Sequence, residues 1–223
     1  MKIFVGYDTR EDITYQVCEY SIKKHCDTAD VIPLVLKDLK ESGIYERPVD
    51  NLGSTEFTFT RFLVPYLADY KGWAIFCDCD FVFTEDVAKL FEQANDKYAV
   101  MVVKHDYTPP SGLKMDGKKQ HAYPRKNWSS MILWNCAHPS NRQVDLRLVN
   151  EETGQYLHRF QWLKDEEIGS VSCEWNWLTD WYEEPRDGVP KALHYTEGGP
   201  WFKDYRHCEY HTVWKKYLTE MMQ

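Results

Sequence analysis

The first hundred residues alternate short apolar runs with stretches whose apolar residues recur at helical spacing. The apolar runs span residues 2–7, 31–36, 73–77 and 98–103. They are nearly continuous, as in strands that a sheet buries on both faces. The stretches with spacings of three and four span residues 13–24, 57–70 and 87–91. This alternation predicts an α/β fold with a mostly parallel central sheet flanked by helices.

The second half of the chain keeps less of this pattern. A strand is predicted at 131–134 and a helix at 141–149, with Ser140 as its N-cap. Between 105 and 126, prolines, glycines and lysines form a stretch longer than an ordinary connection, which is typical of lids and binding loops. We expect a single domain over 1–223, because the length suits one large domain and no repeat or linker divides it.

Charge and cysteine content narrow the possible classes of protein. The net charge is -8, and no run of five lysines or arginines occurs, which disfavours binding to nucleic acid. The seven cysteines include no C-x-x-C pair, so they indicate reduced, mostly buried thiols rather than a zinc site. Because we find neither a signal peptide nor an apolar window long enough for a membrane span, we expect a soluble cytoplasmic protein.

Two aspartates follow the apolar run at 73–77 directly. Alternation along the strand would place Asp78 and Asp80 on one face, where their charges repel each other unless a cation lies between them. Magnesium and manganese accept such oxygen ligands and bridge phosphate oxygens. Aspartates at strand ends also commonly cap the next loop, so the spacing alone leaves a metal site and a capped strand end both open.

Four segments carry a resemblance to a known family. They are Gly6-Tyr7-Asp8, residues 57–62 followed by Asp78-Cys79-Asp80, residues 165–168 followed by Glu174-Trp175-Asn176, and residues 194–201. In this order they resemble the opening strand, the aromatic-x-arginine helix with its D-x-D, the D-Q-D segment with its W-N pair, and the late H-x-x-G-x-x-K-P-W motif of glycosyltransferase family 8. That family includes glycogenin and bacterial lipopolysaccharide galactosyltransferases. The resemblance implies the Rossmann-like GT-A fold of nucleotide-sugar transferases.

The resemblance also implies a metal-dependent enzyme that transfers a hexose from a nucleotide-diphosphate sugar, expected to be UDP-linked, to a saccharide or other hydroxyl acceptor. Retention of the anomeric configuration is expected. Asp78, Asp80 and His194 would hold Mn²⁺ or Mg²⁺, while Asp165 and Glu166 would be the catalytic residues beside the donor sugar. The implied substrate-binding residues are Tyr7, Asp8, Arg61, Asp78, Trp175, Asn176, Gly198, Gly199, Trp201 and Lys203. Residues of about 1–104 would bind the nucleotide, and about 105–223 the donor sugar and acceptor.

The chain departs from the family pattern at two of these positions. Glu166 stands where the family usually has glutamine, and the lysine expected before Pro200-Trp201 is missing, with Lys203 two residues beyond. These departures leave the donor sugar open. Ordinary structural roles also remain open: a buried histidine at 194, a solvated acidic turn at 164–167, core tryptophans, and a plain loop at the two glycines.

Two other functions are compatible with such a fold. A sugar-nucleotide nucleotidyltransferase usually carries a glycine-rich loop with arginine and lysine after its first strand, whereas residues 8–12 contain no glycine. A non-catalytic carbohydrate-binding protein would not need Asp78, Asp80 and His194. Both alternatives are therefore less favoured than sugar transfer.

Overall fold

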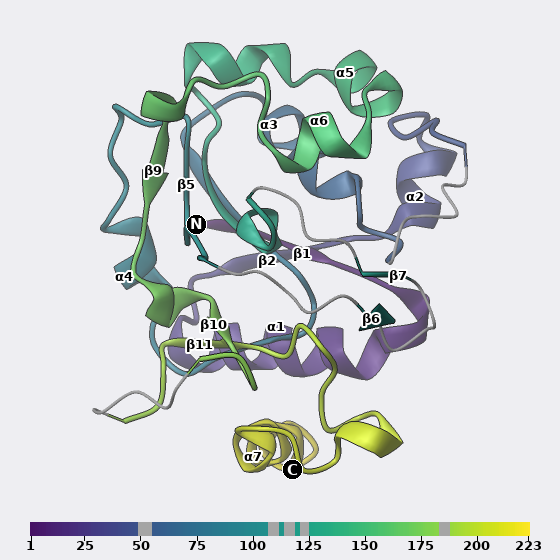
Figure 1. The fold of residues 1–223 in the computed structure, drawn as a ribbon, viewed down its shortest axis with the longest axis vertical. Helices are drawn as coiled ribbons and strands as arrows, with labels where there is room; N and C mark the ends of the chain where they lie inside the picture. Colours follow the sequence, from purple (N-terminus) through teal and green to yellow (C-terminus); the bar gives the residue numbers. More distant parts are fainter. Residues whose placement is uncertain (49–54, 107–111, 114–118, 121–124, 183–187) are drawn as a thin grey trace.

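The computed structural model describes residues 1–48, 55–106, 112–113, 119–120, 125–182 and 188–223 (Figure 1). A six-stranded sheet with the order β2-β1-β3-β8-β5-β9 forms its centre. The strands are β1 (Lys2–Gly6), β2 (Asp30–Leu34), β3 (Trp73–Cys77), β5 (Val100–Val102), β8 (Met131–Asn135) and β9 (Ile168–Ser170). Strand β1 runs parallel to β2 and β3, and β5 runs parallel to β9. Strand β8 is antiparallel to both of its neighbours, so the predicted mostly parallel sheet is confirmed with one reversed strand.

Strand β8 runs opposite to its two neighbours, and this determines which strand ends share one edge of the sheet. Because β3 and β5 are each antiparallel to β8, they run in the same direction, and their carboxyl ends share one edge of the sheet with the amino end of β8. Strand β8 is buried at all five residues, and β3 at four of five, as their continuous apolar runs predicted.

Helices lie above and below the sheet in the view of Figure 1. The helices are α1 (Asp12–His25), α2 (Leu36–Glu41), α3 (Val64–Leu67), α4 (Ala88–Phe91), α5 (Leu146–Glu151), α6 (Gly154–His158) and α7 (His211–Met221). Helices α1 and α7 lie together at the bottom of the view and pack against each other, while α3, α5 and α6 lie at the top. No helix within the described segments is long and apolar enough to cross a membrane.

A second, smaller sheet contains β4 (Phe81–Phe83), the strand that follows β3 along the chain. It has the order β10 (Trp177–Leu178), β11 (Ala192–His194), β4, and its apolar runs are too short to have predicted it. Strand β11 is antiparallel to β4, so His194 lies opposite Phe81. The strands β6 (Gly112–Leu113) and β7 (Lys119–Gln120) fall within the predicted binding loop, most of which lies outside the described residues.

Two predicted helices are wrong in their extent. Over 57–70 the structure has a 3-10 turn (Thr60–Leu63) followed by the single turn of α3, since Arg61 Nε donates to the carbonyls of Phe57 and Thr58. The helix expected at 141–149 is divided: a 3-10 turn ends at Gln143, and α5 begins at Leu146. Buried Asn141 donates to the carbonyls of Ala99 and Asn135, which ties the first segment to the sheet.

The N-cap of α5 differs from the predicted residue, whereas the cysteines are as predicted. Asp145, not Ser140, caps α5, because its Oδ1 accepts from the backbone nitrogen of Leu148 at 2.8 Å. All seven cysteines are free thiols, and five are buried, as predicted.

Candidate functional site

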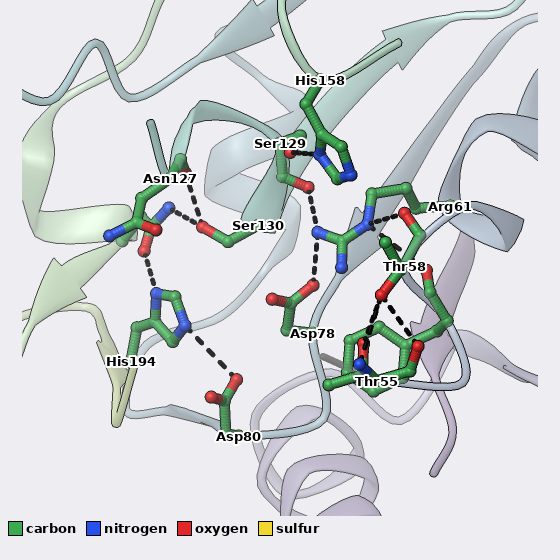
Figure 2. A network of polar contacts seen from close by, with 12 residues as sticks. Thr55, Thr58, Arg61, Asp78, Asp80, Asn127, Ser129, Ser130, His158 and His194 are labelled. Carbon is green, nitrogen blue, oxygen red and sulfur yellow. Dashed lines mark hydrogen bonds and ion pairs between the residues drawn. The ribbon is translucent and has the colours of Figure 1, made fainter. Parts of the chain in front are cut away.

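Asp78, Asp80 and His194 converge at the carboxyl edge of the main sheet (Figure 2). Asp78 directly follows β3, Asp80 lies in the turn before β4, and His194 ends β11. One potential ligand atom from each of the three lies within 4.8 Å of the other two. Nε2 of His194 is 3.4 Å from Oδ1 of Asp80. Two carboxylates and one imidazole therefore share a space that fits a single cation.

The imidazole ring of His194 is buried and is held by a stacked ring and by a hydrogen bond at Nδ1. It is 2% exposed and stacks on Phe81 with the ring centroids 4.4 Å apart. Its Nδ1 lies 2.9 Å from Oδ1 of Asn176, whose Nδ2 donates to Oγ of Ser130 at 2.9 Å. The Ser130 hydroxyl donates to the carbonyl of Asn127 at 2.7 Å, so it accepts from Asn176 (Figure 2). This chain of contacts places the hydrogen on Nδ1 of His194 and leaves the Nε2 lone pair facing Asp80.

Arg61 makes a buried ion pair with Asp78. Its Nη1 lies 2.8 Å from Oδ1 of Asp78 and also donates to the carbonyl of Ser129 at 2.8 Å. The residue is 6% exposed, and its Nε is held by two backbone carbonyls of the preceding turn. The guanidinium is thus fixed next to Asp78, Asp80 and His194, which we call the triad, and it compensates one of the two carboxylates.

Glu11 is a further acidic group at this edge, and the residue patterns did not single it out. Burial raises the pKa of its carboxyl to about 8, and the negative charges of Asp80, Asp8 and Asp78 add to the effect. The available signal was its place just beyond β1, which neighbours β3 in the sheet. Below about pH 8 Glu11 therefore keeps its proton, and a cation bound nearby would favour its ionised form.

Tyr7 and Asp8 also lie at this edge, because β1 and β3 are parallel neighbours. Asp8 is fully buried and accepts from the backbone nitrogen, Nε and Nη2 of Arg10 and from the backbone nitrogen of Glu56. Burial raises the pKa of Asp8, but the hydrogen bonds from Arg10 and Glu56 lower it to a value below the ordinary one. Tyr7 donates to Asp12 at 2.7 Å and stays partly exposed.

The predicted tryptophans and glycines have packing roles. Trp175 is 0% exposed in the main core, and Trp201 packs on Tyr195 and Trp214. A Cβ at Gly199 would lie 1.9 Å from the Trp201 ring, so this glycine makes room for the ring. Gly198 has a φ of 134°, which favours glycine.

Lys203 is exposed and begins a 3-10 turn two residues after Trp201.

The structure does not bring Asp165 and Glu166 to the triad. They lie in a 3-10 turn just before β9, which is parallel to β5 and hence runs in the same direction as β3. The amino end of β9 is therefore at the opposite edge of the sheet from Asp78. Both residues are exposed, and the Asp165 side chain, 87% exposed, pairs with Arg125. This placement is that of a solvated acidic turn.

The fold is that of GT-A glycosyltransferases. The apo form of GlyE from Streptococcus pneumoniae TIGR4 has a TM-score of 0.66 at 16% identity, over 99% of this chain and 61% of that one. The galactosyltransferase LgtC, solved with donor and acceptor sugar analogs, has a TM-score of 0.61 at 10% identity, over 100% of this chain and 97% of that one. The chain thus spans less than two thirds of GlyE and most of LgtC.

The sequence itself has a much nearer relative. It is 50% identical to Protein CDI of Arabidopsis thaliana over 223 residues, which cover 98% of this chain and 86% of the relative. The chain therefore belongs to the family of Protein CDI. No protein-family model matches the sequence.

Proposed function

We propose that this chain is a metal-dependent glycosyltransferase, which moves a hexose from a nucleotide-diphosphate sugar, UDP-linked, to a hydroxyl acceptor. The observation that carries the proposal is the convergence of Asp78, Asp80 and His194, with potential ligand atoms within 4.8 Å, on a glycosyltransferase fold. The carboxyl edge of strands is also where α/β sheets generally bind ligands.

The three side chains suit Mn²⁺ or Mg²⁺ as the metal. Carboxylate oxygens are ligands of both, and neutral imidazole favours manganese. When bound, the ion would neutralise negative charge that develops on the departing nucleoside diphosphate. Asn176 keeps the Nε2 lone pair of His194 available, and Arg61, paired with Asp78, would add a positive charge beside the leaving group.

The remaining roles follow from the resemblance and are proposals of the same kind. The partly exposed Tyr7, with Asp8 behind it, would contact the nucleoside at the end of β1, and the part of about 105–223 would receive the sugar and acceptor. Retention of the anomeric configuration is also proposed. The position of Glu166 gives no support to a double displacement through its carboxylate, because it lies across the sheet from the triad.

Thermal shift with a panel of nucleotide sugars tests the proposal, because a ligand that binds only the folded state raises its apparent stability. We expect at least one UDP-hexose to raise the melting temperature with Mn²⁺ and to have no effect in EDTA. Transfer or slow hydrolysis of that sugar should follow. Pyrophosphate release from a sugar phosphate and UTP would instead show a nucleotidyltransferase, and binding without any turnover would show a carbohydrate-binding protein.

A further inference from the structure

His105 is a second buried histidine at the edge that holds the metal triad. It lies three residues beyond the end of β5, whose carboxyl end shares this edge with that of β3. The residue is 7% exposed. Its carbonyl accepts from Nε1 of Trp128 at 3.3 Å, and Trp128 opens the turn whose last residue, Ser130, supports Asn176. His105 is therefore built into the same framework as His194.

Tyr182 holds one side of the His105 ring. Its Oη makes a hydrogen bond with Nδ1 of His105, and the two rings stack with their centroids 6.0 Å apart. Tyr182 follows β10, which pairs with the strand of His194. The other ring nitrogen of His105, Nε2, is buried and has no hydrogen-bond partner in the described part of the chain. One side of the imidazole is thus fixed, and the other is unsatisfied.

Burial determines the protonation of this pair. It lowers the pKa of His105 to about 3, and a charge on nearby His194 would lower it further, so the ring is neutral. Burial also raises the pKa of Tyr182 to about 12, so the phenol keeps its proton. When that proton is donated to Nδ1, both groups are satisfied and the ring hydrogen is on Nε2. The opposite tautomer would leave the phenol hydrogen without an acceptor among the described residues.

A buried N–H donor without a partner costs stability unless a ligand supplies an acceptor. We infer that His105 donates a hydrogen bond from Nε2 to a hydroxyl oxygen of the transferred hexose, with Tyr182 as its positioning residue. The inference rests on the proposed function. The neutral N–H of His105 suits a sugar hydroxyl, whereas the positively charged metal ion and Arg61 would bind the diphosphate. His105 thereby becomes a residue that selects the donor sugar.

Calorimetric binding of UDP, UDP-glucose and UDP-galactose with Mn²⁺ tests this contact. For His105→Phe we expect UDP affinity within about twofold of wild type and at least one UDP-hexose weakened by roughly three- to tenfold, the range for one lost hydrogen bond. His105→Gln retains an N–H near the position of Nε2 and should recover part of the loss. Tyr182→Phe removes the group that selects the tautomer of His105. It should therefore weaken the affinity for the same UDP-hexose by less than His105→Phe does and leave the affinity for UDP unchanged.

The matched control is a second histidine–tyrosine pair. Nε2 of His25 lies 2.7 Å from Oη of Tyr217, where α1 meets α7, and His25→Phe should leave all three affinities unchanged. Equal affinities of wild type and His105→Phe for both UDP-hexoses would overturn the inference. An equal fall for UDP and the hexoses would overturn it too, because it would show a structural role. A wild-type protein that binds none of the three would refute the proposed function itself.

Discussion

Oδ1 of Asn176 lies 2.9 Å from Nδ1 of His194, and this contact selects the nitrogen that faces the cation site. Because an amide oxygen only accepts, Nδ1 carries the hydrogen and Nε2 presents its lone pair toward Asp80. Asn176 is 0% exposed, and its other amide atom is engaged by Ser130. Asn176 was predicted to bind substrate, but its side chain contacts His194, one of the three candidate metal ligands.

Replacing Asn176 with leucine should weaken Mn²⁺ binding by roughly 10- to 100-fold, the usual effect of losing a residue that orients a metal ligand. Calorimetric titration of the protein with Mn²⁺ measures it. Asn95→Ala, at an exposed position that caps a turn, serves as the control and should bind Mn²⁺ like wild type. Unchanged affinity in Asn176→Leu would mean that the tautomer of His194 is fixed by something else.

Arg61→Met should destabilise the metal-free protein by about 3–5 kcal/mol, because it leaves the partly buried carboxylate of Asp78 without its compensating charge. Urea unfolding in EDTA measures the loss. Saturating Mn²⁺ should recover part of it, since the cation replaces the missing positive charge. A loss below about 1 kcal/mol, the range of a surface ion pair, would show that the contact is weak.

The predictable part of the fold was the part encoded in continuous apolar runs. The run at 73–77 was predicted as β3, and Asp78 was correctly expected at its carboxyl end. The division of the helix predicted at 141–149 was not predictable, because it depends on Asn141, whose side chain donates to the carbonyl of Ala99, 42 residues earlier, and to that of Asn135 at the end of β8.

The site was predictable only where its residues follow a strand that the sequence reveals. Asp78 and Asp80 met this condition. His194 required the resemblance, because its strand has three residues. Glu11 was missed because its nearness to the triad follows from the pairing of β1 with β3. His105 was missed because its nearness follows from the order of strands across the reversed β8, which no local pattern encodes. The same order separates Glu166 from Asp78.

Glu166→Ala should leave Mn²⁺-dependent UDP affinity within about twofold of wild type, because the carboxylate is exposed at the far edge of the sheet. Asp165→Ala should behave alike and cost less than about 1 kcal/mol of stability, since the Asp165 side chain that pairs with Arg125 is 87% exposed. The same calorimetric titration checks both variants. A tenfold weaker affinity in either one would place that side chain in the nucleotide site.

Glu11→Gln should stabilise the metal-free protein at pH 8 and have little effect at pH 5. In the unfolded chain Glu11 ionises near its ordinary pKa of 4.5, whereas in the folded protein its pKa is about 8. The folded state therefore binds the proton more tightly, and stability is lost as pH rises from about 4.5 to 8. Scanning calorimetry in EDTA at pH 8 should show that the melting temperature of Glu11→Gln rises by about 2–4 °C for each kcal/mol gained in the free energy of unfolding. An equal shift at both pH values would point to packing rather than charge.

The central claim is that Asp78, Asp80 and His194 hold a cation on which a nucleoside diphosphate binds. Calorimetric titration with UDP, in Mn²⁺ and in EDTA, tests it most directly when wild type, Asp80→Ala and the exposed control Asp27→Ala are compared. We predict tight binding by wild type and control in Mn²⁺ only, and an affinity at least roughly 100-fold weaker for Asp80→Ala. Equal affinity with Mn²⁺ and with EDTA, unchanged in Asp80→Ala, would contradict the claim.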